Sequence, residues 1–147
     1  MQLAGSGAWK LSKIEFKAVI AGAIVDNVGT LFLMLFLMTA LLSQGLSQED
    51  VVARMKTVSG ELLGLIIGLG CTVLGGYVAG RMAGRDDVLH GALVAGAGVL
   101  AALFFREGGV PTWYDIIGFA GMLPAGMAGG RLAQLRRESR ADANGRD

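Results

Sequence analysis

Two polar residues, Asp26 and Asn27, stand side by side inside the otherwise apolar stretch AGAIVDNVGTLFLM at residues 21–34. On an ideal helix Asp26 lies roughly 13 Å past Lys17, which places its carboxyl group near the middle of a bilayer. Insertion of an Asp at that depth costs about 2.5 to 3.5 kcal/mol. An ionisable residue at this depth is a candidate functional site by default.

The carboxyl group shares a helical stripe with small residues, because Ala18, Gly22, Asp26 and Thr30 recur at every fourth position. Such a stripe is expected to face neighbouring helices rather than lipid. A functional interpretation makes Asp26 a carboxylate for protons, small cations or a polar solute. A structural interpretation gives it a hydrogen bond to Thr72 or to a backbone carbonyl. Both stay open, and the predicted intramembrane polar site comprises Asp26, Asn27, Thr30 and Thr72.

Other chemistry finds little support in the sequence. The single cysteine, Cys71, excludes an internal disulfide, and the single histidine, His90, excludes a bis-His haem and argues against a protein-only zinc site. No Ser/His/Asp or Cys/His set occurs at matching depths. We therefore predict no catalytic residue, no metal and no cofactor, and a protein that is not an enzyme. The net charge of +1, without a basic face, argues against nucleic-acid binding.

The elements that position these residues follow from composition. The sequence is 53% hydrophobic and only 17% charged, with a mean hydropathy of +0.56, whereas soluble domains are about one quarter charged. The charged residues are clustered and leave long apolar runs. We predict an all-α polytopic membrane protein with four transmembrane helices of about 20 residues each. The spans cover about 16–42, 62–80, 88–105 and 114–130, and the first is too long for a signal-peptide core.

Span 16–42 raises a question of geometry. A helix of that length measures roughly 40 Å and exceeds an untilted crossing of about 30 Å. A kink or local unwinding between Asp26 and Gly29 would shorten it, and simple tilt would serve equally well.

The connection between the first two spans has helical character. Ser47 and Asp50 have the spacing of a capping box, in an Asp variant. Three apolar residues follow on one helical face: Val51, Met55 and Val58. The pattern predicts an amphipathic outer helix at 47–59, and an extension of span 62–80 beyond the bilayer is the alternative.

Basic residues set the orientation. The termini and the connections between spans place the 13 Lys and Arg residues unequally on the two sides of the membrane. One side holds Lys10, Lys13, Lys17, Arg81, Arg85, Arg131, Arg136, Arg137, Arg140 and Arg146, and the other holds Arg54, Lys56 and Arg106. The positive-inside rule makes the first side cytoplasmic and predicts a bacterial inner-membrane protein with both termini in the cytoplasm. The expected interface anchors are Trp9, Arg81, Trp113 and Arg131.

The predicted domain organisation has three parts. Residues 1–13 form a cytoplasmic N-terminus, and residues 14–135 form the four-helix transmembrane domain. Residues 136–147 are polar, lack an apolar period and are expected to be a disordered cytoplasmic tail.

Glycine is abundant, at 24 residues. Helices in a bilayer associate through close packing and hydrogen bonds, and small residues let their backbones approach. The spacing predicts helix contacts, within one chain or between chains, at Gly22, Gly68, Gly76, Gly80, Gly84, Gly96, Gly126 and Gly130.

Two segments resemble each other internally. IIGLG at 66–70 through GGYVAGR at 75–81 overlays IIGFA at 116–120 through AGMAGGR at 125–131, at an offset of 50. AVIAGAIV at 18–25 overlays ALVAGAGV at 92–99, at an offset of 74. A duplicated helical hairpin explains the pattern, and chance similarity of glycine-rich helices is the alternative.

The motifs GGYVAGRMAG, HGALVAG and DNVGT resemble those of the small, uncharacterised four-span membrane proteins of bacteria and archaea, over roughly residues 14 to 134. That resemblance implies the fold and carries no biochemical role. We expect a non-enzymatic membrane protein that contacts the lipid bilayer and packs through glycine faces, as a homo-oligomer or as a subunit of a membrane complex. The alternative is a small transporter or channel subunit for protons, cations or a small polar solute, with Asp26 as the titrating group.

Overall fold

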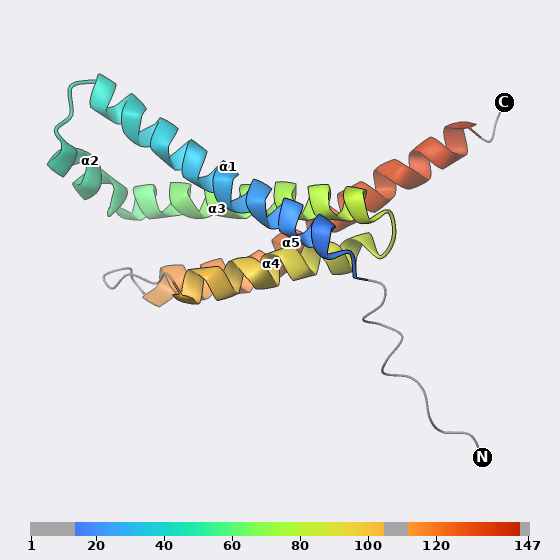
Figure 1. The fold of residues 1–147 in the computed structure, drawn as a ribbon. Coiled ribbons are helices and arrows are strands. Elements are labelled where there is room, and N and C mark those ends of the chain that lie inside the picture. The colour runs from blue at the N-terminus through green and yellow to red at the C-terminus, as the bar shows by residue number, and fades with distance from the viewer. Residues whose placement is uncertain (1–13, 105–111, 145–147) are drawn as a thin grey trace, which may run out of the picture.

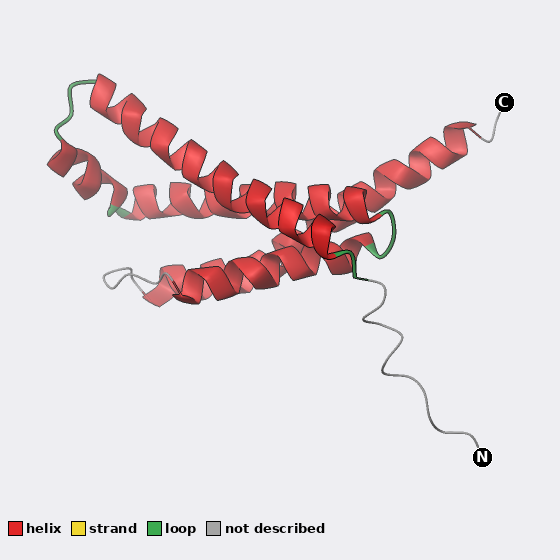
Figure 2. Ribbon diagram, viewed as in Figure 1, coloured by secondary structure: helices red, strands yellow, loops and turns green. Residues whose placement is uncertain are grey.

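The computed structural model describes residues 14–104 and 112–144, and within them the secondary structure is entirely helical (Figure 2). Five helices follow one another along the chain: α1 Phe16–Ser43, α2 Gln48–Met55, α3 Val58–Ala83, α4 Asp87–Phe104 and α5 Thr112–Asn144. All except the short α2 are long and apolar enough to cross a membrane. The predicted all-helical, multi-pass architecture is therefore confirmed.

The four long helices form two antiparallel pairs, α1 with α3 and α4 with α5 (Figure 1). The pairs lie close at the end of the bundle where α1 and α4 begin and α3 ends, which we term the arginine-rich end. Toward the opposite end, where α2 lies and which we term the α2 end, α1 diverges from α3 (Figure 1). Helix α3 is central, since it contacts α1, α4 and α5, whereas α1 contacts α3 and α4.

Helix α1 is continuous through Asp26, Asn27 and Gly29, so local unwinding, one of the alternatives left open by the sequence, does not occur. Its 28 residues run obliquely to α3 (Figure 1), as a tilted span would. Few of its side chains are buried. Large apolar residues such as Phe32 and Phe36 are 67% and 66% exposed, as expected for side chains that face lipid.

The corner between α2 and α3 contains a separate short helix, as one interpretation predicted, and an α3 that begins before the predicted span 62–80, as the other predicted. Ser47 and Asp50 form the predicted capping box at the start of α2. The helix ends at Met55, because the Thr57 hydroxyl accepts the N–H of Gly60 and begins α3. Val58 is therefore the first residue of α3 and is 63% exposed, so its predicted place on the amphipathic face of residues 47–59 is wrong.

Glycine contacts hold the helices together from the middle of the bundle to the arginine-rich end. A Cβ atom on Gly22 would lie 2.6 Å from the carbonyl oxygen of Gly75, and one on Gly80 would lie 3.1 Å from the Cβ of Ala133. Cβ atoms on Gly76 and Gly91 would both meet the carbonyl oxygen of Gly126. Without side chains at these positions, backbones from three pairs of helices come into direct contact.

Gly126 and Gly130 of α5 lie in the same interfaces. A Cβ atom on Gly126 would meet the carbonyl oxygen of Gly91, and one on Gly130 would meet that of Asp87. Gly76 and Gly126 are the equivalent positions of the predicted repeat, and they meet where α3 crosses α5. That meeting is what a two-fold relation between the hairpins would produce, although the duplication itself stays a prediction.

Three other predicted packing glycines differ from expectation. Nothing lies within 4 Å of a Cβ atom placed on Gly68, Gly84 or Gly96. Gly84 instead ends α3 in the left-handed conformation, with φ +65°. Gly96 lies outside the packed face of α4, because the buried residues are Gly91, Val94, Ala95 and Gly98. The predicted packing role of Gly96 is therefore wrong, because the packed face of α4 passes through its neighbour Ala95.

The predicted disordered tail at 136–147 is also wrong as far as Asn144, where α5 ends. Side-chain contacts one turn apart support this extension. Arg131 Nη1 donates to Gln134 Oε1 at 2.9 Å, and Gln134 Nε2 donates to Glu138 Oε1 at 2.8 Å. Helix α5 thus continues well past the predicted end of its span at residue 130.

Candidate functional site

Asp26 is buried where α1 crosses α3. Its side chain is 5% exposed, and its Oδ1 accepts a hydrogen bond of 3.1 Å from the hydroxyl of Thr72, which is fully buried. The same hydroxyl lies 3.1 Å from the carbonyl oxygen of Gly68, one turn earlier in α3. Thr72 therefore orients the carboxyl group, as the structural interpretation of the sequence expected.

A partly open cavity of about 560 Å³ lies beside this carboxyl group. Its lining comes from α1, α3, α4 and α5, mainly in the half of the bundle nearer the α2 end. The polar lining residues are Asp26, Asn27, Thr30, Tyr114 and Asp115, and most other lining side chains are apolar. The Asp26 carboxyl group thus faces a chamber with mainly apolar walls.

Missing side chains create part of this space. Gly68 and Gly98 both line the cavity, and a Cβ atom on Gly98 would lie 3.4 Å from Oδ2 of Asp26. Gly68 therefore keeps the cavity open instead of serving as a helix contact. Toward the arginine-rich end, α1 and α3 are in close contact at Gly22 and Gly75, which do not line the cavity, and a Cβ atom on Gly75 would lie 3.0 Å from the Asp26 Cβ.

The other predicted members of the polar site have lesser roles. Asn27 is exposed at the edge of the cavity, and its Nδ2 donates to the carbonyl oxygen of Ala23 at 2.8 Å, within its own helix. Thr30 lies one turn beyond Asp26 and is half-buried in the cavity wall. The structure therefore brings Asp26 and Thr72 into contact, with Thr30 and Asn27 nearby on the wall.

Sequence reasoning missed Tyr114 as a cavity residue. In the sequence it is only the first residue of the predicted span 114–130, next to the expected anchor Trp113. Its hydroxyl oxygen would lie 3.3 Å from a Cβ atom on Gly64, across the interface between α5 and α3. The ring packs edge-to-face on Trp113, with 6.1 Å between centroids. Only the pairing of α3 with α5 reveals this location, and no local signal in the sequence shows it.

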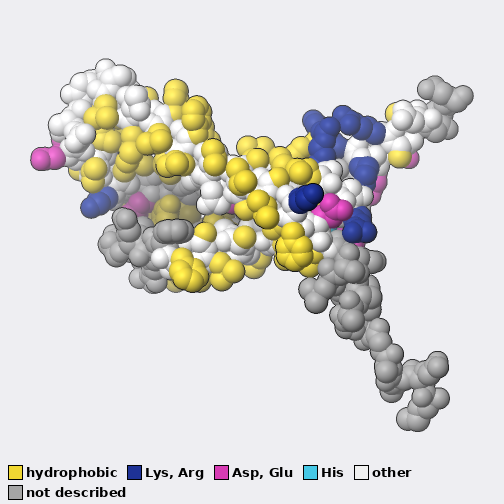
Figure 3. Space-filling view, viewed as in Figure 1, with side chains coloured by type: hydrophobic (Ala, Val, Ile, Leu, Met, Phe, Trp, Pro, Cys, Tyr) yellow, Lys and Arg dark blue, Asp and Glu magenta, His cyan; other side chains and the backbone are white. Residues whose placement is uncertain are grey.

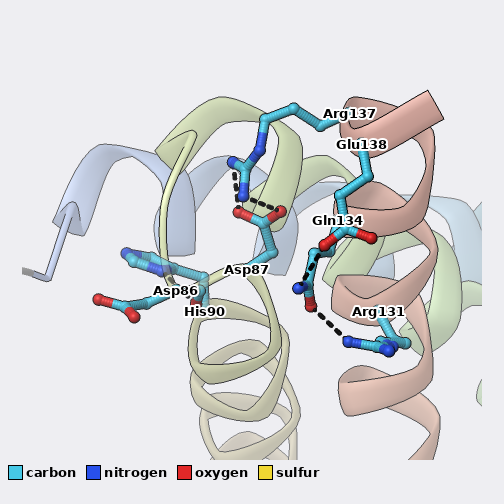
Figure 4. A network of polar contacts seen from close by, with 7 residues as sticks. All are labelled: Asp86, Asp87, His90, Arg131, Gln134, Arg137 and Glu138. Atoms are coloured by element: carbon cyan, nitrogen blue, oxygen red, sulfur yellow. Dashed lines mark hydrogen bonds and ion pairs between the residues drawn. The ribbon is translucent and has the colours of Figure 1, made fainter. Parts of the chain in front are cut away.

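A polar network at the arginine-rich end joins α4 to α5 (Figure 4). Arg137 Nη1 donates to Asp87 Oδ1 at 3.0 Å, and Nη2 lies 2.9 Å from Oδ2. The Asp87 side chain is 1% exposed, whereas that of Arg137 is 46% exposed. This ion pair, with one hydrogen bond to Oδ1, fastens the extended part of α5 to the first residue of α4.

His90 is fully buried and joins α1 to α4. Its Nε2 accepts the backbone N–H of Glu15 at 3.0 Å, and its Nδ1 lies 3.1 Å from the carbonyl oxygen of Asp86. Because a backbone N–H only donates and a carbonyl only accepts, the proton belongs on Nδ1 of a neutral ring. His90 thus has a structural role at the start of both helices.

Arginines gather at this same end, whereas apolar side chains cover most of the remaining visible surface (Figure 3). The predicted anchors Arg81 and Arg131 are exposed there, and Trp113 is half-buried near the α2 end. The predicted anchor Trp9 lies outside the described residues. Within residues 14–104 and 112–144, no group of three His, Cys, Asp or Glu side chains could hold a metal ion.

No protein-family model, curated protein or solved structure matches this chain. The resemblance to small four-span membrane proteins of bacteria and archaea therefore stays a hypothesis, and functional inference rests on the geometry of the site.

Proposed function

We propose that this chain is a non-enzymatic integral membrane protein that binds a small, mainly apolar cation in the cavity beside Asp26. The observation that carries the proposal is the position of the Asp26 carboxyl group on the wall of a mainly apolar chamber of about 560 Å³. A carboxylate is costly in such surroundings without a compensating charge, and a bound cation supplies one. The apolar walls favour a ligand that is apolar apart from its charged group.

The other lining residues of the cavity beside Asp26 also suit a small, mainly apolar cation. Thr72 holds one carboxyl oxygen, and the other is directed toward the cavity residue Gly98. The aromatic residues Phe119 and Tyr114 also line the cavity, and aromatic faces attract cations. The site therefore offers the fixed carboxyl group of Asp26, a second carboxyl group on the wall at Asp115, and several apolar or aromatic surfaces.

Binding of 2-phenylethylammonium to the purified protein in detergent, followed by titration calorimetry, tests the proposal. Its neutral analogue 2-phenylethanol separates the contribution of charge from that of shape. We expect Asp26→Asn to weaken binding of the cation at least about tenfold, because a charge-assisted hydrogen bond contributes about 1.5 to 3 kcal/mol. Glu49→Gln removes one negative charge from an exposed site on α2 and should leave binding unchanged. Equal affinity of the unmodified chain and the Asp26→Asn variant for the cation would contradict the proposal.

A small transporter or channel subunit is the second candidate, with Asp26 as the titrating group. The position of the cavity favours it, because the lining residues lie mainly in the half of the bundle nearer the α2 end and Asp26 is the lining residue of α1 farthest from that end. A carrier open to one side would have this arrangement. Proton or cation flux into liposomes that is lost in Asp26→Asn would support this candidate, and no flux from the intact chain would exclude it.

Orientation and assembly complete the proposal. The basic bias of the sequence supports placement in a bacterial inner membrane with both termini cytoplasmic, so that the arginine-rich end faces the cytoplasm. Self-association, or packing into a larger membrane complex, is supported by the 24 glycines of the sequence, since small residues let helix backbones approach. The mass of the intact complex in detergent tests the assembly.

A further inference from the structure

A second, smaller pocket lies at the arginine-rich end, between the last turns of α3 and the extension of α5. Its volume is about 170 Å³. The lining is polar and basic: Tyr77, Arg81, Asp87, Ala133, Arg136, Arg137 and Arg140. None of these residues lines the cavity beside Asp26, so the two sites are separate.

Two guanidinium groups converge on one oxygen in this pocket. The hydroxyl oxygen of Tyr77 accepts hydrogen bonds of 3.3 Å from Nη1 of Arg81 and of 3.3 Å from Nη1 of Arg136. Arg136 also lies over the Tyr77 ring, 5.9 Å from its centroid. A tyrosine hydroxyl is a neutral acceptor, so these contacts position both guanidinium groups without balancing their charges.

The carboxylate of the pocket is already engaged. Both oxygens of Asp87 face Arg137, at 3.0 and 2.9 Å (Figure 4). Among the residues that the structure describes, the other three guanidinium groups of the pocket have no carboxylate partner. They belong to Arg81, Arg136 and Arg140. The pocket is thus a concave site with an excess of fixed donors and positive charge.

We propose that this pocket binds a phosphate group. Guanidinium groups present planar forks of donors that match phosphate oxygens, and several forks can share one phosphate. The pocket lies where α5 passes beyond its predicted span, and the apolar side chains of Leu74 and Leu135 nearby along α3 and α5 are 57% and 44% exposed. Basic pockets between membrane helices are suited to anionic headgroups. The phosphodiester of an anionic lipid is therefore the expected source, and free phosphate is the alternative source of the same chemistry.

Native mass spectrometry of the full chain in detergent, with added phosphatidylglycerol, tests the proposal. The test variant is Arg81→Gln/Arg136→Gln. The matched control, Arg85→Gln/Arg131→Gln, removes the same charge from exposed arginines at the same end but outside the pocket. We expect the test variant to weaken lipid binding at least about tenfold, as loss of charge-assisted hydrogen bonds requires, and the control to weaken it less than about threefold.

Further arms identify the source of the phosphate. Zwitterionic phosphatidylcholine should bind more weakly than phosphatidylglycerol, and inorganic phosphate should displace the lipid only if the site takes free phosphate. Arg81 and Arg136 both donate to Tyr77, whereas Arg140 lines the pocket without such a contact. Arg140→Gln should therefore weaken lipid binding without disturbing Tyr77. Equal losses in the test and control variants would overturn the proposal, and so would the absence of binding by both phosphatidylglycerol and inorganic phosphate.

Discussion

The hydroxyl group of Thr72 donates to the carboxyl group of Asp26 across the crossing of α1 and α3, at 3.1 Å. The two residues are 46 positions apart, and both are buried. The bond fixes the Asp26 carboxyl group on the wall of the cavity. Both the stability of the crossing and the chemistry of the cavity depend on this pair.

Removal of one partner should destabilise this crossing. We expect Thr72→Val to lower the free energy of unfolding by about 1 to 3 kcal/mol, because it leaves a buried acceptor unsatisfied. Unfolding in mixed detergent micelles measures the change. Thr39→Val is the matched control, since its exposed hydroxyl bonds only within α1, to Leu35, and it should change stability by less than about 0.5 kcal/mol. Similar losses in both variants would show that the Asp26 bond has no special role.

A leucine at position 68 should fill the cavity without disturbing helix packing. Nothing lies within 4 Å of a Cβ atom on Gly68 or on Gly70, and only Gly68 lines the cavity. We therefore expect Gly68→Leu to abolish calorimetric binding of 2-phenylethylammonium, while Gly70→Leu binds it as the unmodified chain does. If Gly68→Leu still bound the cation with unchanged affinity, its site would lie elsewhere.

Alanine should be tolerated very differently at two glycines. A Cβ atom on Gly76 would collide with the backbone of Gly126, whereas one on Gly96 would meet nothing within 4 Å. We expect Gly76→Ala to destabilise the protein by about 1 to 3 kcal/mol and Gly96→Ala to stabilise it by up to about 1 kcal/mol. Thermal unfolding in detergent measures both. Equal effects would mean that α3 and α5 do not cross at this point.

Loss of Arg137 should leave a buried carboxylate without its ion pair. Removal of one partner from a fully buried ion pair usually lowers the free energy of unfolding by about 3 to 5 kcal/mol. We expect Arg137→Ala to lower it by less than this, because water reaches the half-exposed Arg137. Arg140→Ala removes an exposed arginine without an ion pair among the described residues and should cost less than about 0.5 kcal/mol. The difference in unfolding free energy between the two variants is the test, and a difference near zero would contradict the pairing.

The sequence was informative about the helices and less so about their faces. Long apolar runs are enough to predict four spans, and the stripe through Gly22 and Asp26 correctly suggested a packed face of α1. On α4 every candidate face contains small residues, so spacing could not separate the Gly91 face from the Gly96 face. The choice depends on which face meets Gly126, and this contact is not local in sequence.

The cavity and the end of α5 lay beyond sequence reasoning for the same reason. Tyr114 becomes a cavity residue only once α5 packs on α3. The polar run after Leu135 has no apolar period, and its attachment depends on Asp87, 50 residues earlier in the chain. Isolated helical propensity cannot reveal such a partner.

The central claim is that the Asp26 carboxylate faces a chamber accessible to cations, and thiol modification tests it most directly. In a Cys71→Ala background, Gly118→Cys places a thiol in the cavity wall, where a Cβ atom makes only an ordinary contact of 3.5 Å with Leu65. Gly70→Cys places one outside the cavity. The measured quantity is the ratio of the reaction rates of cationic aminoethyl methanethiosulfonate and neutral methyl methanethiosulfonate.

We expect Asp26→Asn to lower this ratio on the order of tenfold at position 118 and to leave it unchanged at position 70, because a nearby carboxylate attracts the cationic reagent in a medium of low dielectric constant. An unchanged ratio at position 118, or a thiol there that reacts with neither reagent, would contradict the claim.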